Sequence, residues 1–249
     1  MSLDSVHDPG VTADTAMAPT DCARDLLSAL RAGDSPDPYL ATLAAYDDAD
    51  LEPIRADSRA ALAFWANCYN AGTQLLLDRR PHLYESPLRF FRFFNATALT
   101  VAGTDVTLDE MEHGILRGSK SKYGLGYLPR FLPRTFEMRY RVPIPDPRIH
   151  FVLNCGAESC PAIRVYEADR IDEQLDRATA AYLRSAVTYD AAADVVRLPR
   201  LFRWYRGDFG GPRGIRRLLA RYDVTPADAM PDLQYKPWDW SRAAAKFAD

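Results

Sequence analysis

The residues best suited to chemistry are two cysteines and a histidine within one short segment, 148–161. Cys155 and Cys160 are two of only four cysteines in the chain, and His150 is one of only four histidines. Just before the thiols, the run 149–154 alternates apolar and other side chains, which predicts a strand that ends in a Gly-containing loop. Loops at the ends of regular elements commonly carry functional side chains. We therefore expect the chemistry of this protein to lie here.

Cys160 is the leading candidate for a nucleophile. Pro161 follows it, and a helical turn that starts at this proline leaves Cys160 at the N-terminal end, where the pKa of a thiol is lowered. A nucleophilic thiol needs a base, and His113 and His150 are the two histidines within predicted elements. Cys155 is a second candidate, as nucleophile or as resolving thiol. Both cysteines are also compatible with a role as small buried hydrophobic residues.

These side chains leave three functions open. The first is a thiol-dependent hydrolase or acyltransferase with a Cys nucleophile and a His base, acting on a small-molecule or peptide substrate. The second is a thiol–disulfide redox protein that uses Cys155 and Cys160, and the third is a non-enzymatic interaction module. A Cys2His2 zinc set of His113, His150 and the two thiols is a further interpretation. The spacing lacks a C-x2-C pair, so we expect no metal and no other cofactor.

One predicted helix contains the longest stretch without a charged side chain, 60–77. A helix that is apolar nearly all round lies at the centre of its domain. Asn67 and Asn70 fall on one side of it, and buried amides must find hydrogen-bond partners. They form either an internal network that fixes packing or a polar wall beside a catalytic pocket. Together with Asn154 and Arg148, they are our candidate binding residues.

The surrounding sequence predicts the elements that position these groups. Thr107 and Glu110 form a capping box at the start of a helix that carries His113. The segments 99–106 and 187–198 each predict a β-hairpin. We therefore predict an α+β fold, in which a central buried helix packs on a small, mainly antiparallel sheet with helices around it.

Length and composition predict one globular domain, 20–249, after a disordered tail, 1–19. The chain is 47% hydrophobic and 26% charged, as ordinary globular proteins are. A net charge of -3 argues against a partner recognised by bulk positive charge, such as nucleic acid. The tail lacks the basic and apolar regions of a secretory signal, and the stretch 60–77 is too short and too polar to span a bilayer unaided. We expect a cytoplasmic protein without a membrane span.

Several segments together resemble the domain-of-unknown-function 547 family. The matching segments are 64–71, 108–117, 146–155 and 159–161, followed by C-terminal signatures within 204–209 and 238–241. The resemblance covers the chain from about residue 50 to its end, and it implies no agreed activity. Plant members of the family are described in disulfide-oxidoreductase terms, whereas its Cys and His motifs invite comparison with papain-like hydrolases. A papain-like arrangement is therefore one form that the predicted fold can take. The family usually has another small residue in place of Cys68, so the resemblance implies no role for that thiol.

Overall fold

The computed structural model describes residues 17–243 and 245–248. The predicted tail therefore lies almost wholly outside the described residues, and its last residue, Pro19, begins the first helix. The α-helices are α1 (Pro19–Ala32), α2 (Asp37–Ala45), α3 (Glu52–Ala56), α4 (Ser58–Arg79), α5 (Pro87–Asn95), α6 (Thr135–Tyr140), α7 (Ile171–Ala186), α8 (Leu201–Trp204) and α9 (Gly211–Arg221). Shorter helical segments are η1 (Pro81–Tyr84), η2 (Glu110–Leu116), η3 (Pro147–Phe151) and η4 (Ala168–Arg170).

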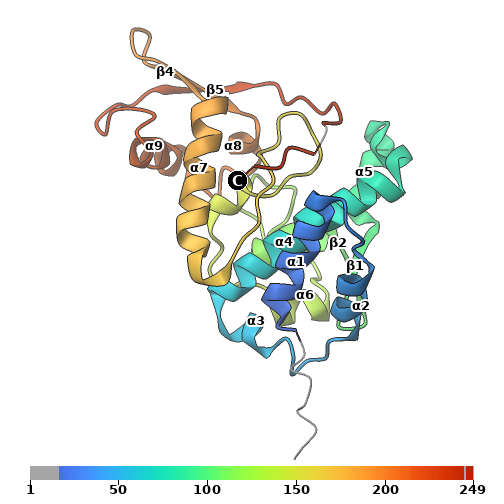
Figure 1. The fold of residues 1–249 in the computed structure, drawn as a ribbon. Helices are drawn as coiled ribbons and strands as arrows, with labels where there is room; N and C mark the ends of the chain where they lie inside the picture. The colour runs from blue at the N-terminus through green and yellow to red at the C-terminus, as the bar shows by residue number, and fades with distance from the viewer. Residues whose placement is uncertain (1–16, 244, 249) are drawn as a thin grey trace, which may run out of the picture.

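Helix α4 lies at the centre of the molecule, with α1 packed along it (Figure 1). Most of its side chains between Ala60 and Leu77 are buried, as expected for a helix without a charged face. Asp57 caps the first turn by accepting a hydrogen bond of 2.8 Å from the N–H of Arg59. The prediction of a long, buried central helix is confirmed. None of the helices in the described part of the chain combines the length and the apolar composition needed to cross a membrane.

Two small sheets complete the α+β fold. Strands β1 (Thr97–Val101) and β2 (Thr104–Thr107) form an antiparallel hairpin, and β1 packs on α4. In the second sheet, β3 (Thr188–Asp190) is antiparallel to β4 (Val195–Pro199), and β5 (Asp232–Lys236) pairs with β4 in parallel. This sheet lies at the end of the molecule that also contains α8 and α9 (Figure 1). Both predicted hairpins are confirmed.

The strand predicted over 149–154 is wrong. The chain forms the 3-10 helix η3 up to Phe151 and then continues without regular structure. Asp146 starts this turn by accepting a hydrogen bond from the N–H of Arg148, and a proline at the first position is already set for a helical turn. Ile149 belongs to the larger hydrophobic core and Phe151 to the smaller one. The apolar pattern therefore reflects burial between two cores and not the alternating faces of a strand.

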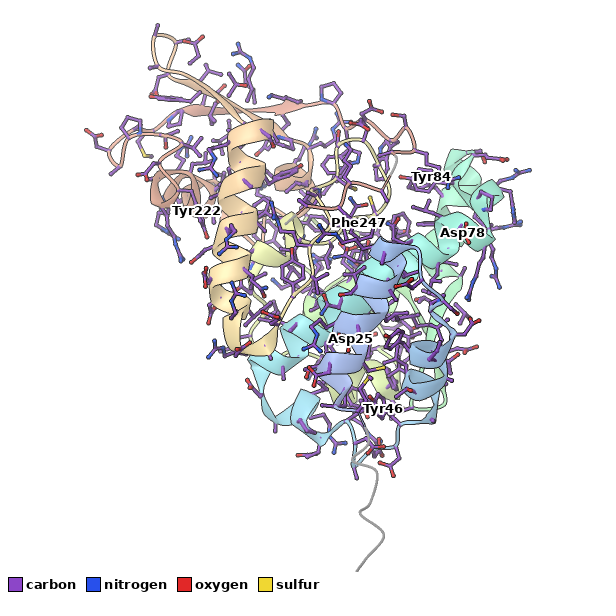
Figure 2. All side chains as sticks on the ribbon, viewed as in Figure 1. Asp25, Tyr46, Asp78, Tyr84, Tyr222 and Phe247 are labelled. Atoms are coloured by element: carbon purple, nitrogen blue, oxygen red, sulfur yellow. The ribbon has the colours of Figure 1, made fainter. Side chains whose placement is uncertain are left out.

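The two hydrophobic cores lie side by side. The larger one surrounds α4, whereas the smaller one includes Phe151 and the aromatic residues of α8 and the segment after it. Figure 2 shows Phe247, near the end of the chain, lying over the larger core, where it forms a β-bridge with Ile163. Tyr222, which follows α9, lies beside α7 and donates a hydrogen bond to Asp176 of that helix. The C-terminal third of the chain thus folds back over the region that contains Cys155 and Cys160.

Candidate functional site

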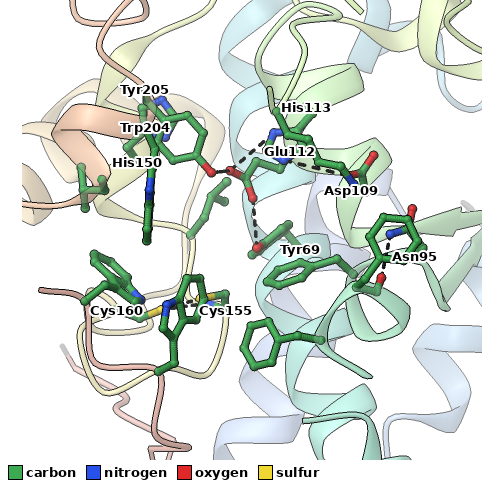
Figure 3. Close-up of a pocket in the computed structure, with 18 of the residues that line it drawn as sticks. Tyr69, Asn95, Asp109, Glu112, His113, His150, Cys155, Cys160, Trp204 and Tyr205 are labelled. Atoms are coloured by element: carbon green, nitrogen blue, oxygen red, sulfur yellow. Dashed lines mark hydrogen bonds and ion pairs between the residues drawn. The ribbon is translucent and has the colours of Figure 1, made fainter. Parts of the chain in front are cut away.

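A cavity of about 400 Å³ opens where the two hydrophobic cores meet (Figure 3). Elements far apart in the sequence contribute to it, among them α4, α5, η2, η3 and α8. Its ionisable and thiol groups include Asp109, Glu112, Lys122, His113, His150, Cys155 and Cys160, and most of its other lining residues are aromatic. The four candidate catalytic residues from the sequence therefore line one cavity.

The two thiols of the cavity wall are in contact. All four cysteines are free, and the sulfur atoms of Cys155 and Cys160 lie 2.8 Å apart. The backbone N–H of Cys155 also donates a hydrogen bond of 3.2 Å to the sulfur of Cys160. Burial alone raises the pKa of Cys160, but hydrogen bonds from the Cys155 thiol and from backbone N–H groups outweigh it, so the pKa lies below its usual value. The bond to Cys160, together with burial, raises the pKa of Cys155 well above normal. Cys160 is thus the sulfur that holds a negative charge more easily.

The amides of Asn70 and Asn154 hold the loop that carries the thiols. Asn154 donates from Nδ2 to the carbonyl of Pro161 at 2.6 Å and accepts at Oδ1 from the N–H of Gly156 at 2.8 Å. Asn70 accepts from the N–H of Asn154 at 2.9 Å and donates to the carbonyl of Val152 at 3.0 Å. Both amides are therefore engaged with the backbone, and neither lines the cavity.

Asn67 and Arg148 also lie away from the cavity. Asn67 makes two hydrogen bonds to the backbone of Tyr166, 2.8 Å to its carbonyl and 2.9 Å from its N–H. Arg148 forms ion pairs with Asp146 and with two aspartates of α7, Asp172 and Asp176. These contacts tie α4 and α7 to the loops around the thiols. That these residues, or Asn70 and Asn154, bind a substrate stays a prediction.

The helix that carries His113 is a π-helix, η2. The predicted capping box is present, because the N–H of Glu110 donates to the Thr107 hydroxyl and the N–H of Thr107 donates to the Glu110 carboxylate, each at 3.1 Å. The N–H of Arg117 bonds to the carbonyl of Glu112 at 2.9 Å, five residues back. Single turns of π-helix occur frequently at functional sites. Here the π-helix places Glu112 and His113 on the same cavity wall.

Glu112 lies between two tyrosines that come from different parts of the fold. Tyr205 donates to one carboxylate oxygen at 2.7 Å and Tyr69 of α4 to the other at 3.2 Å. Figure 3 shows both hydroxyls pointing at Glu112, with Tyr69 on the side of the thiols. Burial raises the pKa of Glu112, but the positive charge that His113 has when it is protonated and the hydrogen bond from the Tyr205 hydroxyl outweigh burial, so the net pKa is lowered. Glu112 is therefore a buried carboxylate that accepts one hydrogen bond from each tyrosine hydroxyl.

His113 is neutral, and its tautomer follows from its contact with Arg117. The guanidinium lies 2.8 Å from Nδ1 of His113, and because Arg can only donate, this nitrogen accepts. The proton of the neutral imidazole is then on Nε2, whose nearest carboxylate oxygen, on Asp109, is 4.0 Å away. Burial lowers the pKa of His113 from 6.5 to about 4, and the charge of Arg117 adds to this. His113 thus presents an N–H donor to the cavity.

His150 has the opposite arrangement, because a carboxylate holds its Nε2. The distance from this nitrogen to Asp208 is 2.8 Å, and the imidazole stacks on the ring of Tyr205 with centroids 4.0 Å apart. Asp208 also binds the guanidinium of Arg117 at 2.7 Å and Lys120 at 2.9 Å. Burial raises the pKa of Asp208, but its bonds to His150 and Arg117 prevail and the pKa falls below normal. Burial lowers the pKa of His150, and in the neutral imidazole that donates from Nε2 to Asp208 the lone pair is on Nδ1.

Neither imidazole makes a hydrogen bond to either sulfur within the described part of the chain. The thiol–thiol contact and the His150–Asp208 pair are therefore two separate units, and of the second unit only His150 lines the cavity. No group of three or more His, Cys, Asp and Glu side chains among the residues described is arranged to hold a metal ion.

Sequence reasoning did not single out Tyr69, Glu112, Tyr205, Asp208 or the aromatic walls. Two of the family-like segments, 108–117 and 204–209, contain Glu112, Tyr205 and Asp208, and this was the available signal. No local pattern indicates that these two segments meet in space.

Comparison with known families agrees with the resemblance found in the sequence. The model of the family described as "Protein of unknown function, DUF547" matches residues 54–183, which is more than half of the chain. Comparison with curated proteins and with solved structures finds no match. The matched region includes α4, η2 and both thiols of the cavity, whereas Tyr205 and Asp208 follow it. The chain therefore belongs to the DUF547 family of proteins of unknown function.

Proposed function

We propose that Cys155 and Cys160 form a thiol–disulfide redox pair. The observation that carries this proposal is the 2.8 Å separation of their sulfur atoms at the wall of the cavity. Two thiols in contact need only a small movement to form a disulfide, whereas a Cys hydrolase needs its thiol beside a base. Both cysteines line the cavity, and Cys155 is partly exposed whereas Cys160 is buried, so the cavity is the route by which a dissolved reactant would reach the pair.

The different environments of the two sulfurs support a different role for each of them. Cys160 is the attacking thiolate, because the thiol and backbone N–H of Cys155 donate hydrogen bonds to it and lower its pKa. Cys155 is the resolving thiol. Its raised pKa keeps its proton in place until Cys160 has reacted and no longer holds a negative charge.

The reaction needs a disulfide compound as the oxidant. The Cys160 thiolate attacks one sulfur of this compound, a mixed disulfide forms, and the first substrate thiolate leaves and takes up a proton. Cys155 then loses its proton, its thiolate attacks the Cys160 sulfur, and the second substrate thiol is expelled as the Cys155–Cys160 bond closes. Two electrons pass from the protein to the substrate, and a dithiol reductant reverses the sequence.

A thiol-dependent hydrolase or acyltransferase is the second candidate, and the Asp208–His150 pair favours it. A carboxylate that holds Nε2 leaves Nδ1 of His150 as a base on the wall that also contains Cys160. The Nε2–H of His113 would then stabilise a developing oxyanion. This candidate ranks second because the required imidazole–thiol contact is not formed among the described residues. A papain-like arrangement would belong with this candidate.

Stopped-flow reaction with 4,4′-dithiodipyridine, a small disulfide that releases a coloured thione, separates the candidates. We expect the wild type to release two equivalents rapidly and to end with Cys155 joined to Cys160. Cys155→Ser should release one equivalent and keep the mixed disulfide on Cys160, detected by mass spectrometry. Cys22 and Cys68 are fully buried and serve as internal controls.

Two outcomes would replace the redox proposal. Rapid cleavage of 4-nitrophenyl acetate that survives Cys155→Ser and is lost in Cys160→Ser would establish the hydrolase. Equal, slow reaction of all four thiols would leave the cysteines structural and favour an interaction module.

A further inference from the structure

The walls of the cavity above the thiols are aromatic. Trp204, Trp238 and Trp240 all line it and pack together, with ring centroids 5.5–5.9 Å apart. Phe90 of α5 meets the ring of Trp240 edge-on at 4.9 Å and closes the wall on the other side. Aromatic faces and edges of this kind favour another planar ring. The cavity is also within the size range of small-molecule sites.

The rim of the cavity is aromatic as well. Phe91, Tyr123 and Trp240 line it and yet remain 56%, 69% and 43% exposed. The ammonium of Lys122 lies 4.8 Å from the ring centre of Phe91 and 5.6 Å from that of Tyr123, joining the two rings across the entrance. Exposed apolar side chains that gather at one place mark a binding site more often than scattered ones do. This aromatic rim continues the apolar wall out to solvent.

The charged groups of the cavity already have partners, so a ligand has no need to carry charge. Asp109 binds Lys122 at 2.7 Å and also binds Arg130, at 2.5 Å. Glu112 accepts hydrogen bonds from both neighbouring tyrosines. A charged ligand would have to break one of these pairs or enter an apolar space without a counter-charge, and both are costly.

One polar atom in the aromatic wall has no hydrogen-bond partner among the described residues. The indole Nε1 of Trp238 is buried and makes no hydrogen bond within the described part of the protein. A buried N–H without an acceptor is destabilising, and such groups in native structures call for an explanation. The Nε2–H of His113 is a second donor, with its nearest carboxylate oxygen at 4.0 Å. Because protein atoms cover the Nε1 of Trp238, the donor that the cavity offers to a ligand is the Nε2–H of His113, and a ligand matches it with an acceptor.

We propose that the cavity takes a small, uncharged aromatic compound with a hydrogen-bond acceptor on its ring, held by the three tryptophans and the Nε2–H of His113. This inference rests on the proposed function in one respect, since the natural substrate is then a disulfide or thiol attached to such a ring. Highly charged peptide disulfides such as glutathione disulfide are poor substrates, because their charges find no free partners in the cavity.

Isothermal titration with two probes of equal shape tests the ligand class. 4-Phenylpyridine, unprotonated at mildly alkaline pH, has one ring nitrogen as acceptor, and biphenyl has none. We expect saturable binding of 4-phenylpyridine, with biphenyl about five- to tenfold weaker, as the loss of one hydrogen bond predicts. His113→Leu should abolish the difference between the two probes, whereas Trp238→Phe should keep it. Glutathione disulfide should not displace 4-phenylpyridine.

Further variants locate the site. Trp240→Ala should weaken 4-phenylpyridine binding by about tenfold or more, because a whole aromatic wall is lost. Phe91 belongs to the exposed rim, where a substitution affects folding least. Phe91→Ala should weaken the binding of 4-phenylpyridine by a smaller factor than Trp240→Ala does. Phe131→Ala is the matched control, because Phe131 is 88% exposed and does not line the cavity.

Separate measurements of 4-phenylpyridine binding and of disulfide formation distinguish this inference from the redox proposal. If the thiols form no disulfide but 4-phenylpyridine binds and responds to His113→Leu and Trp240→Ala, the ligand class stands and the redox function fails. If the disulfide forms but 4-phenylpyridine does not bind, or binds equally to every variant, the inference on ligand class is overturned while the redox function stands.

Discussion

Replacing His113 by Gln tests how the cavity wall keeps this imidazole neutral. Burial lowers the pKa of His113 from 6.5 to about 4. As the pH falls through 6.5 the unfolded chain takes up a proton at this position, but the folded chain does so only near pH 4. The contribution of His113 to stability is therefore lost progressively between these two pH values and is constant below them. Between pH 7 and pH 5 the loss amounts to about 2 kcal/mol.

Gln at this position removes the titration while keeping an acceptor for Arg117. Urea unfolding followed by circular dichroism at both pH values measures the effect. We expect the wild type to lose about 2 kcal/mol more stability than His113→Gln on going from pH 7 to pH 5. Burial also lowers the pKa of His150, which adds a loss of the same sign, but this loss remains in the variant and cancels in the comparison. His82→Gln, at an exposed position in η1, is the control.

The reasoning would be refuted by an equal loss of stability in wild type and His113→Gln. It would also be refuted by NMR titration of the folded protein if the His113 imidazole took up its proton near pH 6.5.

Two further substitutions test the packing around this wall. Arg117→Met removes the fully buried guanidinium that binds Asp208 and should lower the free energy of unfolding by about 3 kcal/mol, whereas the same change at exposed Arg141 should have little effect. Thermal denaturation measures the stability of both variants. An equal effect of the two changes would contradict a stabilising role of the buried Arg117–Asp208 pair. Gly114→Ala places a methyl group 2.6 Å from the buried side chain of Glu137. This clash should lower the free energy of unfolding by about 1–3 kcal/mol. In a double-mutant cycle, Glu137→Ala should relieve part of this loss, and strict additivity would rule out the contact.

The parts of the fold that follow from local pattern could be predicted from the sequence. The uncharged stretch of α4 and the turn of the β1–β2 hairpin each lie within a short segment, so hydrophobic periodicity and turn chemistry suffice. The capping box also marked the start of η2, but nothing local distinguishes a π-helix from an α-helix. The segment 149–154 was misassigned because its burial comes from two cores that form only in the tertiary structure.

Part of the candidate site could also be predicted from local sequence, and the rest depends on tertiary contacts. Cys155 and Cys160 are five residues apart and share a loop, so their proximity was open to prediction. The contacts from Tyr205 to Glu112 and from Asp208 to His150 join residues 93 and 58 positions apart. Such contacts depend on how the C-terminal third folds back, and one sequence contains no signal for that.

The measurement that tests the central claim most directly is a redox equilibrium. The full chain is incubated in dithiol–disulfide buffers of increasing oxidising strength, quenched with an alkylating reagent and mapped by mass spectrometry. The account predicts one reversible two-electron transition, in which Cys155 and Cys160 become joined while Cys22 and Cys68 stay reduced. Oxidation of the pair to no greater extent than the two fully buried thiols, at every potential, would contradict it.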